Sequence, residues 1–579
     1  MTATDASFHS VSLGPLSLRL DNNGAFAREI SLHGEELFRG VGLVVRDANW
    51  GTPTLSASAA VVQHSDLATV KSGGVLNHPG GDLTWSIDWS ITPRGLEAKA
   101  VATSRSGFDT NRTGFVVLHS LLATRGRAVC VTHPHGKIEE TRFPDLVSPH
   151  QPFFDITALE YTTAAGHRLR LRFEGEIFEI EDQRNWTDAS YKTYCRPLRL
   201  PYPYRIGPSA RVEQSVQVQF LAQPPVIVET SEAKPLIQKS AAMPLLGTSL
   251  PPGPLLPCQA EALRALSLRF TAIEIDLSDA DWLAVAETKI AVAPGPLRID
   301  VRGSEPDDTR AAISALSPML RSKTIIGLSL WDADEALISA ARTAAPGIRI
   351  GGGTGAFFTE LNRLKHWPAA DYLAWTSNPT VHGSDDDTIG ESTEPLADIV
   401  RTARHRSESL KFQIGPMTLG LRYNPNATTP EGRRQAAPAD PRQGDIVAAA
   451  WMVGTIAGFI DSAIETLTFF EPAGPKGLLS DDGIWSPAAY VLARLSPLAG
   501  RPVSVLRWTG NQRAAGLLIE APNERILCLA YPRDEDIPLS LPPGAWRRRE
   551  KLTRSGFVET TGAEYRTGRF GVSWLVGPL

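Results

Sequence analysis

The chain has 579 residues, of which 42% are hydrophobic and 21% are charged, and its formal net charge is -5. This length exceeds what one hydrophobic core organises, so we expect several domains. The slight negative charge excludes the broad basic surface with which proteins bind nucleic acid or anionic lipid, so neither is expected as a partner.

The N-terminal stretch "MTATDASFHSVSLGP" has no basic region followed by an apolar run, and no later segment is apolar enough to span a membrane. We therefore expect a cytoplasmic protein with no membrane partner. The four cysteines are scattered and form no CxxC pair, which is typical of neither a disulfide framework nor a zinc site.

Residues 1–222 are predicted to form an N-terminal antiparallel β-sandwich. Apolar and polar residues alternate with a period of two in "VSLGPLSLRL", "HRLRLRF" and "VEQSVQVQF", and "DNNG" at 21–24 is typical of a hairpin. We find no amphipathic helix in this part, which favours a sandwich of many strands. Prolines then crowd residues 223–243, which we interpret as a linker.

Residues 244–498 alternate short apolar strands with helical patterns, which predicts a central (β/α)8 barrel of the TIM type. An open doubly wound sheet is the alternative, although no GxGxxG follows the first strand. From 499 to 579 the period of two returns and predicts a small C-terminal β-domain, so the fold class is multidomain α/β plus β. The eight barrel strands are expected at 244–250, 270–278, 297–303, 324–332, 348–355, 372–379, 410–416 and 464–472.

Barrel enzymes carry their functional groups on the loops that follow the C-terminal ends of the strands. The loop after the fifth strand, "GGGTGAFFTELNR", offers Glu360 and Asn362, and its glycines would let the backbone approach a ligand closely. The alternative for Glu360 is a first-turn acid favoured by the helix dipole.

The loop after the sixth strand, "TSNPTVHGSDDDTIGES", contains Asn378, His382, Asp385 and Asp386. A histidine close to several carboxylates is typical of a general base whose pKa they raise. The alternative is a solvated acidic loop in which one Asp caps the next helix.

The last two strands end in "IGPMTLGLRYNPN", with Arg422 and Tyr423, and in "TFFEPAGPKG", with Glu471. A carboxylate that follows two Phe on a buried strand is costly unless it is paired or functional. Position alone therefore makes Glu471 the strongest catalytic candidate, with Glu360 and His382 beside it, and we expect Asn362, Asn378, Asp385, Asp386, Arg422 and Tyr423 to bind substrate.

Several enzyme classes are disfavoured by what the strand ends lack. A retaining glycosidase of the common barrel type carries acids after its fourth and seventh strands, but the seventh strand here has none; a pair of Glu360 and Glu471 stays possible. There is no GxSxG and no HExxH. The HxH of His133 and His135 lies in the sandwich half and is not expected to bind a metal, so no metal site is predicted.

The stretch "EDQRNWTDASYKTY" at 181–194 mixes acids and bases with one Trp and two Tyr. Such a mixture is typical of an interface or of a surface on which a sugar stacks. It forms either a seam between sandwich and barrel or one wall of the cleft, and we favour the wall. Glu179, Glu181, Asp182, Arg184, Asn185 and Trp186 are therefore expected near the substrate.

Four segments, "FEGEIFEIEDQRNWTDASYKTY", "EETRFPDLVSPHQPFFDI", "GGGTGAFFTELNR" and "TSNPTVHGSDDDTIGES", resemble the D-apionate lactonase family of bacterial apiose catabolism. The resemblance covers essentially the whole chain. It implies a carboxylic ester hydrolase that converts D-apionolactone to D-apionate in the cytoplasm, with a sugar lactone as its partner and no cofactor. No catalytic residues are carried over from the family.

A lactone carbonyl is already electrophilic, so a base, an acid and donors for the oxyanion suffice. We expect Glu471 or Glu360 to activate the water, His382 to donate to the leaving oxygen, and Arg422 or Asn362 to hold the oxyanion. Two alternatives stay open: a glycoside hydrolase that acts on a branched pentoside with Glu360 and Glu471, and a sugar-binding protein without activity. The sequence leaves the oligomeric state open.

Overall fold

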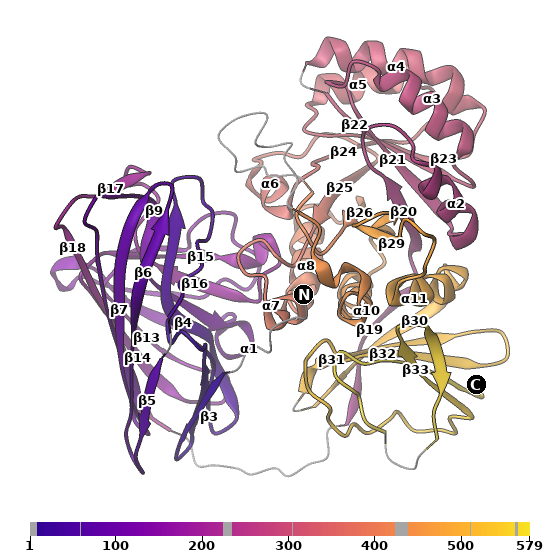
Figure 1. The fold of residues 1–579 in the computed structure, drawn as a ribbon. Helices are drawn as coiled ribbons and strands as arrows, with labels where there is room; N and C mark the ends of the chain where they lie inside the picture. Colours follow the sequence, from indigo (N-terminus) through magenta and orange to yellow (C-terminus); the bar gives the residue numbers. More distant parts are fainter. Residues whose placement is uncertain are drawn as a thin grey trace. The chain divides into compact units, whose positions relative to one another are not determined.

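A computed structural model describes residues 8–57, 59–223, 234–303, 305–422, 438–509, 511–561 and 565–579, so the candidate Tyr423 lies outside the described residues. The chain divides into two compact units (Figure 1). The first consists of Met1–Arg184 and Ala189–Glu229, and the second of Asn185–Asp188 and Thr230–Leu579. Four residues from the middle of the predicted sandwich thus belong to the second unit.

The first unit is an 18-stranded sheet whose strand pairs are antiparallel, as predicted. A β-sandwich is compatible with this sheet. Its strands are β1 (His9–Leu13), β2 (Leu16–Leu20), β3 (Phe26–Leu32), β4 (Glu35–Asp47), β5 (Ala60–Gln63), β6 (Ala68–His78), β7 (Gly81–Thr92), β8 (Gly95–Thr103), β9 (Phe108–Ser120), β10 (Ala128–Thr132), β11 (Ile138–Arg142), β12 (Phe153–Ile156), β13 (Ala158–Thr162), β14 (Arg168–Glu174), β15 (Phe178–Asp182), β16 (Ser190–Tyr194), β17 (Tyr204–Ile206) and β18 (Arg211–Ala222), with short helices α1 (Leu121–Thr124), η1 (Pro134–Gly136) and η2 (Gln183–Trp186).

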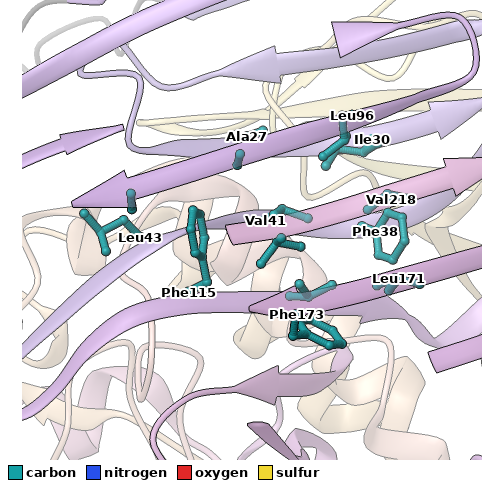
Figure 2. Packing of buried hydrophobic residues seen from close by; sticks show 14 of the residues in the cluster. Ala27, Ile30, Phe38, Val41, Leu43, Leu96, Phe115, Leu171, Phe173 and Val218 are labelled. Carbon is teal, nitrogen blue, oxygen red and sulfur yellow. The ribbon is translucent and has the colours of Figure 1, made fainter. Parts of the chain in front are cut away.

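Side-chain alternation explains why these residues form strands. On β7, Trp85, Ile87 and Trp89 are buried, while the residues between them are exposed. Figure 2 shows the core that such positions form, where Phe115, Leu171 and further side chains from several strands pack together. Burying each large apolar side chain contributes roughly 1.5–3 kcal/mol, which stabilises the register that puts them all on one face.

The second unit contains a closed barrel of eight parallel strands, which confirms the predicted barrel and excludes the open sheet. Each strand pairs with the next, and the last closes onto the first through Gly247 and Thr468. The strands are β20 (Leu245–Leu250), β21 (Phe270–Asp276), β22 (Leu297–Arg302), β23 (Ile325–Leu330), β24 (Ile350–Gly353), β25 (Tyr372–Ser377), β26 (Lys411–Met417) and β27 (Ile464–Phe469).

Helices cover the outside of the barrel, and α3, α4 and α5 lie side by side there in Figure 1. The helices are α2 (Pro257–Leu266), α3 (Trp282–Val292), α4 (Pro306–Arg321), α5 (Glu335–Ala344), α6 (Phe358–Arg363), α7 (Asp386–Glu391), α8 (Leu396–Arg406), η3 (Pro441–Gly444), α10 (Ile446–Phe459), α11 (Pro487–Leu495) and η4 (Ser496–Leu498). None of the helices within the described ranges is long and apolar enough to cross a membrane.

An antiparallel sheet near the C-terminus completes the second unit, in the order β19-β30-β31-β32-β35-β33-β34. Helix α10 is apolar all round because it packs between barrel strand β27 and this sheet. The strands are β19 (Pro235–Ala242), β30 (Pro502–Trp508), β31 (Asn511–Glu520), β32 (Arg525–Ala530), β33 (Arg548–Thr553), β34 (Gly556–Glu559) and β35 (Val572–Gly577), and β28 (Glu471–Ala473) pairs separately with β29 (Gly477–Leu479).

Strand β19 lies inside the stretch 223–243 that the sequence predicts to be a linker. It pairs antiparallel with β30, from Pro235 opposite Trp508 to Ala242 opposite Pro502. Its single proline is at the first strand position of an edge strand, where a missing N–H does no harm. The prolines around it suggested a linker, but they do not interrupt the strand itself.

Two glycines, Gly327 on β23 and Gly351 on β24, are required by packing inside the barrel. A Cβ on Gly351 would lie 2.3 Å from the ring of Tyr372, and a Cβ on Gly327 would also meet this ring. Tyr372 is fully buried, and its hydroxyl is 2.9 Å from Ser329 Oγ. The expected role of Gly351 in approaching a ligand is therefore replaced by a role in accommodating Tyr372.

We predict that Gly351→Ala lowers the free energy of unfolding by about 1–3 kcal/mol, because the buried Tyr372 ring must move. Urea denaturation of the full chain measures this change. Gly444→Ala is the matched control, since its added Cβ meets nothing within 4 Å. Equal losses for the two variants would contradict the packing role of Gly351.

Candidate active site

A small pocket lies at the C-terminal ends of β25 and β26. Asn378 and Arg422, two residues expected to bind substrate, both line it. The lining residues are Phe357, Thr376, Ser377, Asn378, Pro416, Thr418, Leu421 and Arg422.

Arg422 joins this pocket to two carboxylates. Its Nη2 donates to Glu274 Oε1 at 2.6 Å and lies 3.9 Å from Glu471 Oε1. Ser249 Oγ also donates to Glu274 Oε1, at 2.9 Å. The loop after β27 adds Lys476, whose Nζ is 3.4 Å from the Leu421 carbonyl oxygen. We call Glu274, Arg422, Glu471 and Lys476 the Arg422 cluster.

The two carboxylates of this cluster differ in their electrostatics. Burial raises the pKa of Glu471, the charge of Glu274 raises it further, and the opposing effect of Arg422 is too small to cancel them. Burial also raises the pKa of Glu274, but Arg422, together with the charge of Arg302 and the hydrogen bond from Ser249, lowers it overall. Glu274 is therefore the ionised partner of Arg422. Glu471 has a raised pKa, which is typical of a carboxyl group that transfers protons.

Glu360 lies in the first turn of α6, as the helix-dipole alternative expects. Burial raises its pKa, Arg363 opposes this, and Asp332 adds a like charge that raises it further. The pKa of Asp332 itself is raised by burial, against a hydrogen bond from Thr354. Glu360 thus stays a second candidate base.

The segment Asn185–Asp188 contacts the loops after β24 and β25, and we call these four residues with His382 the His382 cluster. Asp188 Oδ2 is 2.6 Å from His382 Nδ1, and the Trp186 ring meets the His382 ring edge-on, with centroids 5.6 Å apart. Asn362 Nδ2 donates to Asn185 Oδ1 at 3.0 Å. Asn185 and Trp186 are thus brought to the barrel face, and their contact with substrate stays a prediction.

The other four residues expected from this stretch belong to the first unit, where each has a partner. Glu179 accepts from the Tyr194 hydroxyl and from Leu198 N, and Glu181 pairs with Lys192. Asp182 and Arg184 form a fully buried ion pair at 2.7 Å, and Arg184 also donates to three carbonyl groups of residues 144–146. These contacts anchor the chain that leads into Asn185.

The acidic loop after β25 organises helix α7. Asp385 caps this helix and accepts from Thr388 N at 2.9 Å. Asp386 pairs with Arg442 at 2.5 Å, and Asp387 pairs with Arg533 at 2.6 Å. The carboxylates of this loop therefore have protein partners, and the expected binding of substrate by Asp385 and Asp386 stays a prediction.

We predict that Arg533→Met lowers the free energy of unfolding by about 3 kcal/mol, because it leaves the Asp387 and Glu391 carboxylates without their guanidinium. Thermal and urea unfolding measure this loss. Arg566→Met is the matched control in the same C-terminal part of the chain, since both partners of the Arg566–Asp536 pair are well exposed. It should cost less than about 1 kcal/mol, and a cost equal to that of Arg533→Met would contradict the prediction.

Sequence reasoning missed four residues of the two clusters: Glu274, Lys476, Thr187 and Asp188. Glu274 carried a usable signal, since it is an acid inside the apolar strand "FTAIEIDLS", and the burial cost that singled out Glu471 applies equally to it. Thr187 and Asp188 lie in the polar stretch "TDAS", which is typical of an ordinary turn. Lys476 follows β27 in a short Gly-rich loop and had no signal of its own.

Comparison with known proteins supports one family. Residues 1–223 match the family model for the D-apionate lactonase N-terminal domain, and residues 327–500 match that for the D-apionate lactonase TIM barrel domain. A D-apionate lactonase from Brucella anthropi is 31% identical over 541 residues, which cover 84% of this chain and 87% of the relative. The chain belongs to the D-apionate lactonase family. The chain is therefore a lactonase, a carboxylic ester hydrolase, and the resemblance noted from its sequence is confirmed.

Two solved structures resemble this member of the D-apionate lactonase family only distantly. A family 51 arabinofuranosidase from Xanthomonas axonopodis pv. citri is 10% identical, with a TM-score of 0.43 over 60% of this chain and 99% of its own. A family 30 endoxylanase from Clostridium papyrosolvens is 10% identical, with a TM-score of 0.41 over 60% of this chain and 100% of its own. The family assignment does not depend on either.

Proposed function

We propose that this protein hydrolyses D-apionolactone to D-apionate in the catabolism of D-apiose. The name of its Brucella anthropi relative supports this substrate. Asn378 and Arg422, which line the small pocket, offer polar groups for the hydroxyl and carbonyl oxygens of such a lactone. The observation that carries the chemistry is the Arg422 cluster, in which a buried carboxylate with a raised pKa lies 3.9 Å from a guanidinium.

Glu471 acts as the general base in this proposal. It takes a proton from the water that attacks the lactone carbonyl, and a pKa raised towards neutrality suits this task. Arg422 stabilises the negative charge that develops on the carbonyl oxygen. Arg422 is better suited to this role than Asn362, because its guanidinium is charged and carries further N–H groups besides the one that donates to Glu274.

The charges around Glu471 also suit the product. Three cations, Arg422, Lys476 and Lys289, act electrostatically on this carboxylate. A site with more cations than ionised carboxylates favours the carboxylate that ring opening creates. The product is thus a better ligand for this site than a neutral sugar of the same size.

The glycosidase alternative is not favoured. A retaining glycosidase needs two carboxyl groups roughly 5–5.5 Å apart, and both must be available to the sugar. The carboxylate beside Glu471 is Glu274, which is bound by Arg422 and Ser249. Membership of a lactonase family also argues against glycoside cleavage.

The substrate is tested by measuring acid release in a pH-stat. We expect D-apionolactone to be opened with a higher kcat/KM than other aldonolactones, because the pocket is small and polar. Aryl pentosides are the control, and no reducing sugar should appear from them. Reducing sugar from the pentosides with no acid from any lactone would contradict the proposal.

We predict that Glu471→Gln lowers kcat by about 100-fold or more, as expected for the loss of a general base. Wild-type kcat should rise with pH through the raised pKa of Glu471, and the variant should lose this rise. Because the folded-state pKa is raised, wild type loses stability relative to Glu471→Gln as pH rises above the ordinary glutamate pKa. Loss of activity without loss of stability at neutral pH therefore identifies a catalytic role.

Glu465→Gln is the matched control for this variant. Glu465 lies on β27, the strand that leads to Glu471, and pairs with Arg349 near the N-terminal end of that strand. Its kcat should stay near that of wild type, because conserved chemistry in such barrels lies at the opposite face. A kcat for Glu471→Gln within about threefold of wild type would remove Glu471 as the base and leave Glu360 to be tested.

A further inference from the structure

Asp188 and His382 form a close pair on the barrel face. Asp188 Oδ2 lies 2.6 Å from His382 Nδ1, and the two side chains are 13% and 26% exposed. In this contact the imidazole Nδ1–H donates to the carboxylate, which makes it a charge-assisted hydrogen bond largely shielded from solvent. Such a bond selects one tautomer and one orientation of the ring.

The rest of the segment Asn185–Asp188 holds this pair in place. Thr187 Oγ1 donates to the carbonyl oxygen of Asn378 at 2.8 Å, four residues before His382. The Trp186 ring packs edge-on against the imidazole, and the Arg363 guanidinium lies 5.3 Å from the centre of the Trp186 ring. The residues next to Asp188 therefore contact both α6 and the loop after β25, which contains His382.

The acids nearest to His382 in sequence have other partners. Asp385 caps α7, Asp386 pairs with Arg442, and Asp387 pairs with Arg533. The carboxylate at Nδ1 comes instead from Asp188, 194 residues away in sequence. A neutral side chain would suffice to bridge two loops, whereas a carboxylate on an imidazole also supports proton transfer.

The geometry points to Asp188 as the positioning residue of His382, and to His382 as the acid that protonates the leaving oxygen of the lactone. This inference rests on the proposed lactone hydrolysis and adds to it a residue outside the barrel sequence. With Nδ1 bound to Asp188, the proton is transferred at Nε2, so the carboxylate determines which nitrogen faces the reaction.

His382 protonates the ring oxygen as the lactone ring opens. The bond between the former carbonyl carbon and the ring oxygen breaks, and its electron pair stays on that oxygen. The proton on His382 Nε2 moves to the oxygen and gives a free hydroxyl, while the C=O double bond reforms. Glu471 releases to solvent the proton that it took from water, the new carboxylic acid ionises, and His382 regains a proton. One lactone and one water thus give one hydroxycarboxylate and one proton.

The test is Asp188→Asn, which keeps the shape of the side chain, removes its charge and lets either imidazole tautomer bind. We expect kcat on the lactone to fall by about 10- to 1,000-fold, with KM within about threefold of wild type. The double variant with His382→Gln should be no slower than His382→Gln alone, because Asp188 acts through His382. A purely structural role would make the two losses multiply.

Asp371→Asn is the matched control. Asp371 precedes β25, the strand that leads into the His382 loop, and it binds Arg342 and Ile350 N at the opposite end of the barrel. This variant should change stability and leave kcat within about threefold of wild type. A kcat for Asp188→Asn within that same range, or multiplying losses in the double variant, would overturn the inference.

A second measurement does not depend on the reaction. Nitrogen-15 spectra of labelled histidine report the tautomer of His382, and the His382→Gln spectrum identifies its signals among the 12 histidines. We expect a protonated Nδ1 in wild type and a mixture of tautomers in Asp188→Asn. If wild type opens no lactone, the proposed function fails, while these spectra still decide whether Asp188 positions His382; an unchanged tautomer in Asp188→Asn would overturn that role.

Discussion

Closure of the parallel barrel is the constraint on which the rest of the second unit depends. When β27 pairs with β20, the C-terminal ends of all eight strands come to one face. Residues far apart in sequence, such as Glu274 and Glu471, then become neighbours of one guanidinium. The closed ring also requires small residues opposite large ones in its interior, as Gly351 and Tyr372 show.

Arg422 gives this face its chemical asymmetry. Two buried carboxylates close together would otherwise repel each other, and both pKa values would rise. Because Arg422 is hydrogen-bonded to Glu274 and stands farther from Glu471, the pKa of Glu274 falls and that of Glu471 rises. Two identical side chains thus take different roles because their environments differ: Glu274 is the ionised partner of Arg422, and Glu471 is the group suited to proton transfer.

The His382 cluster shows a second use of long-range contacts. Residues 185–188 lie between two strands of the first unit in sequence, yet they belong to the second unit by their contacts. They bring Asp188 to His382 and Asn185 to Asn362. Directly before this segment, Asp182 and Arg184 form a fully buried ion pair within the first unit.

Much of the architecture could be predicted from local patterns. The period of two, the eight alternating strands and helices, and the return to a period of two indicate the antiparallel sheet, the barrel and the C-terminal sheet, because side-chain periodicity reflects which face is buried. The position of Glu471 at a buried strand end marked it for the same reason. The strand Pro235–Ala242 was not predicted, because the prolines around it are typical of a linker and its partner β30 lies far along the chain.

By itself, then, the sequence determined the fold class, the family resemblance and the strand ends where chemistry could lie. Only the tertiary structure decided which side chains meet there. Arg422 with Glu274, and His382 with Asp188, are separated by 148 and 194 residues, and no local pattern encodes such pairs. The physical reason is that periodicity records whether a residue is buried, whereas pKa and hydrogen bonding depend on which charge closure of the barrel places beside it.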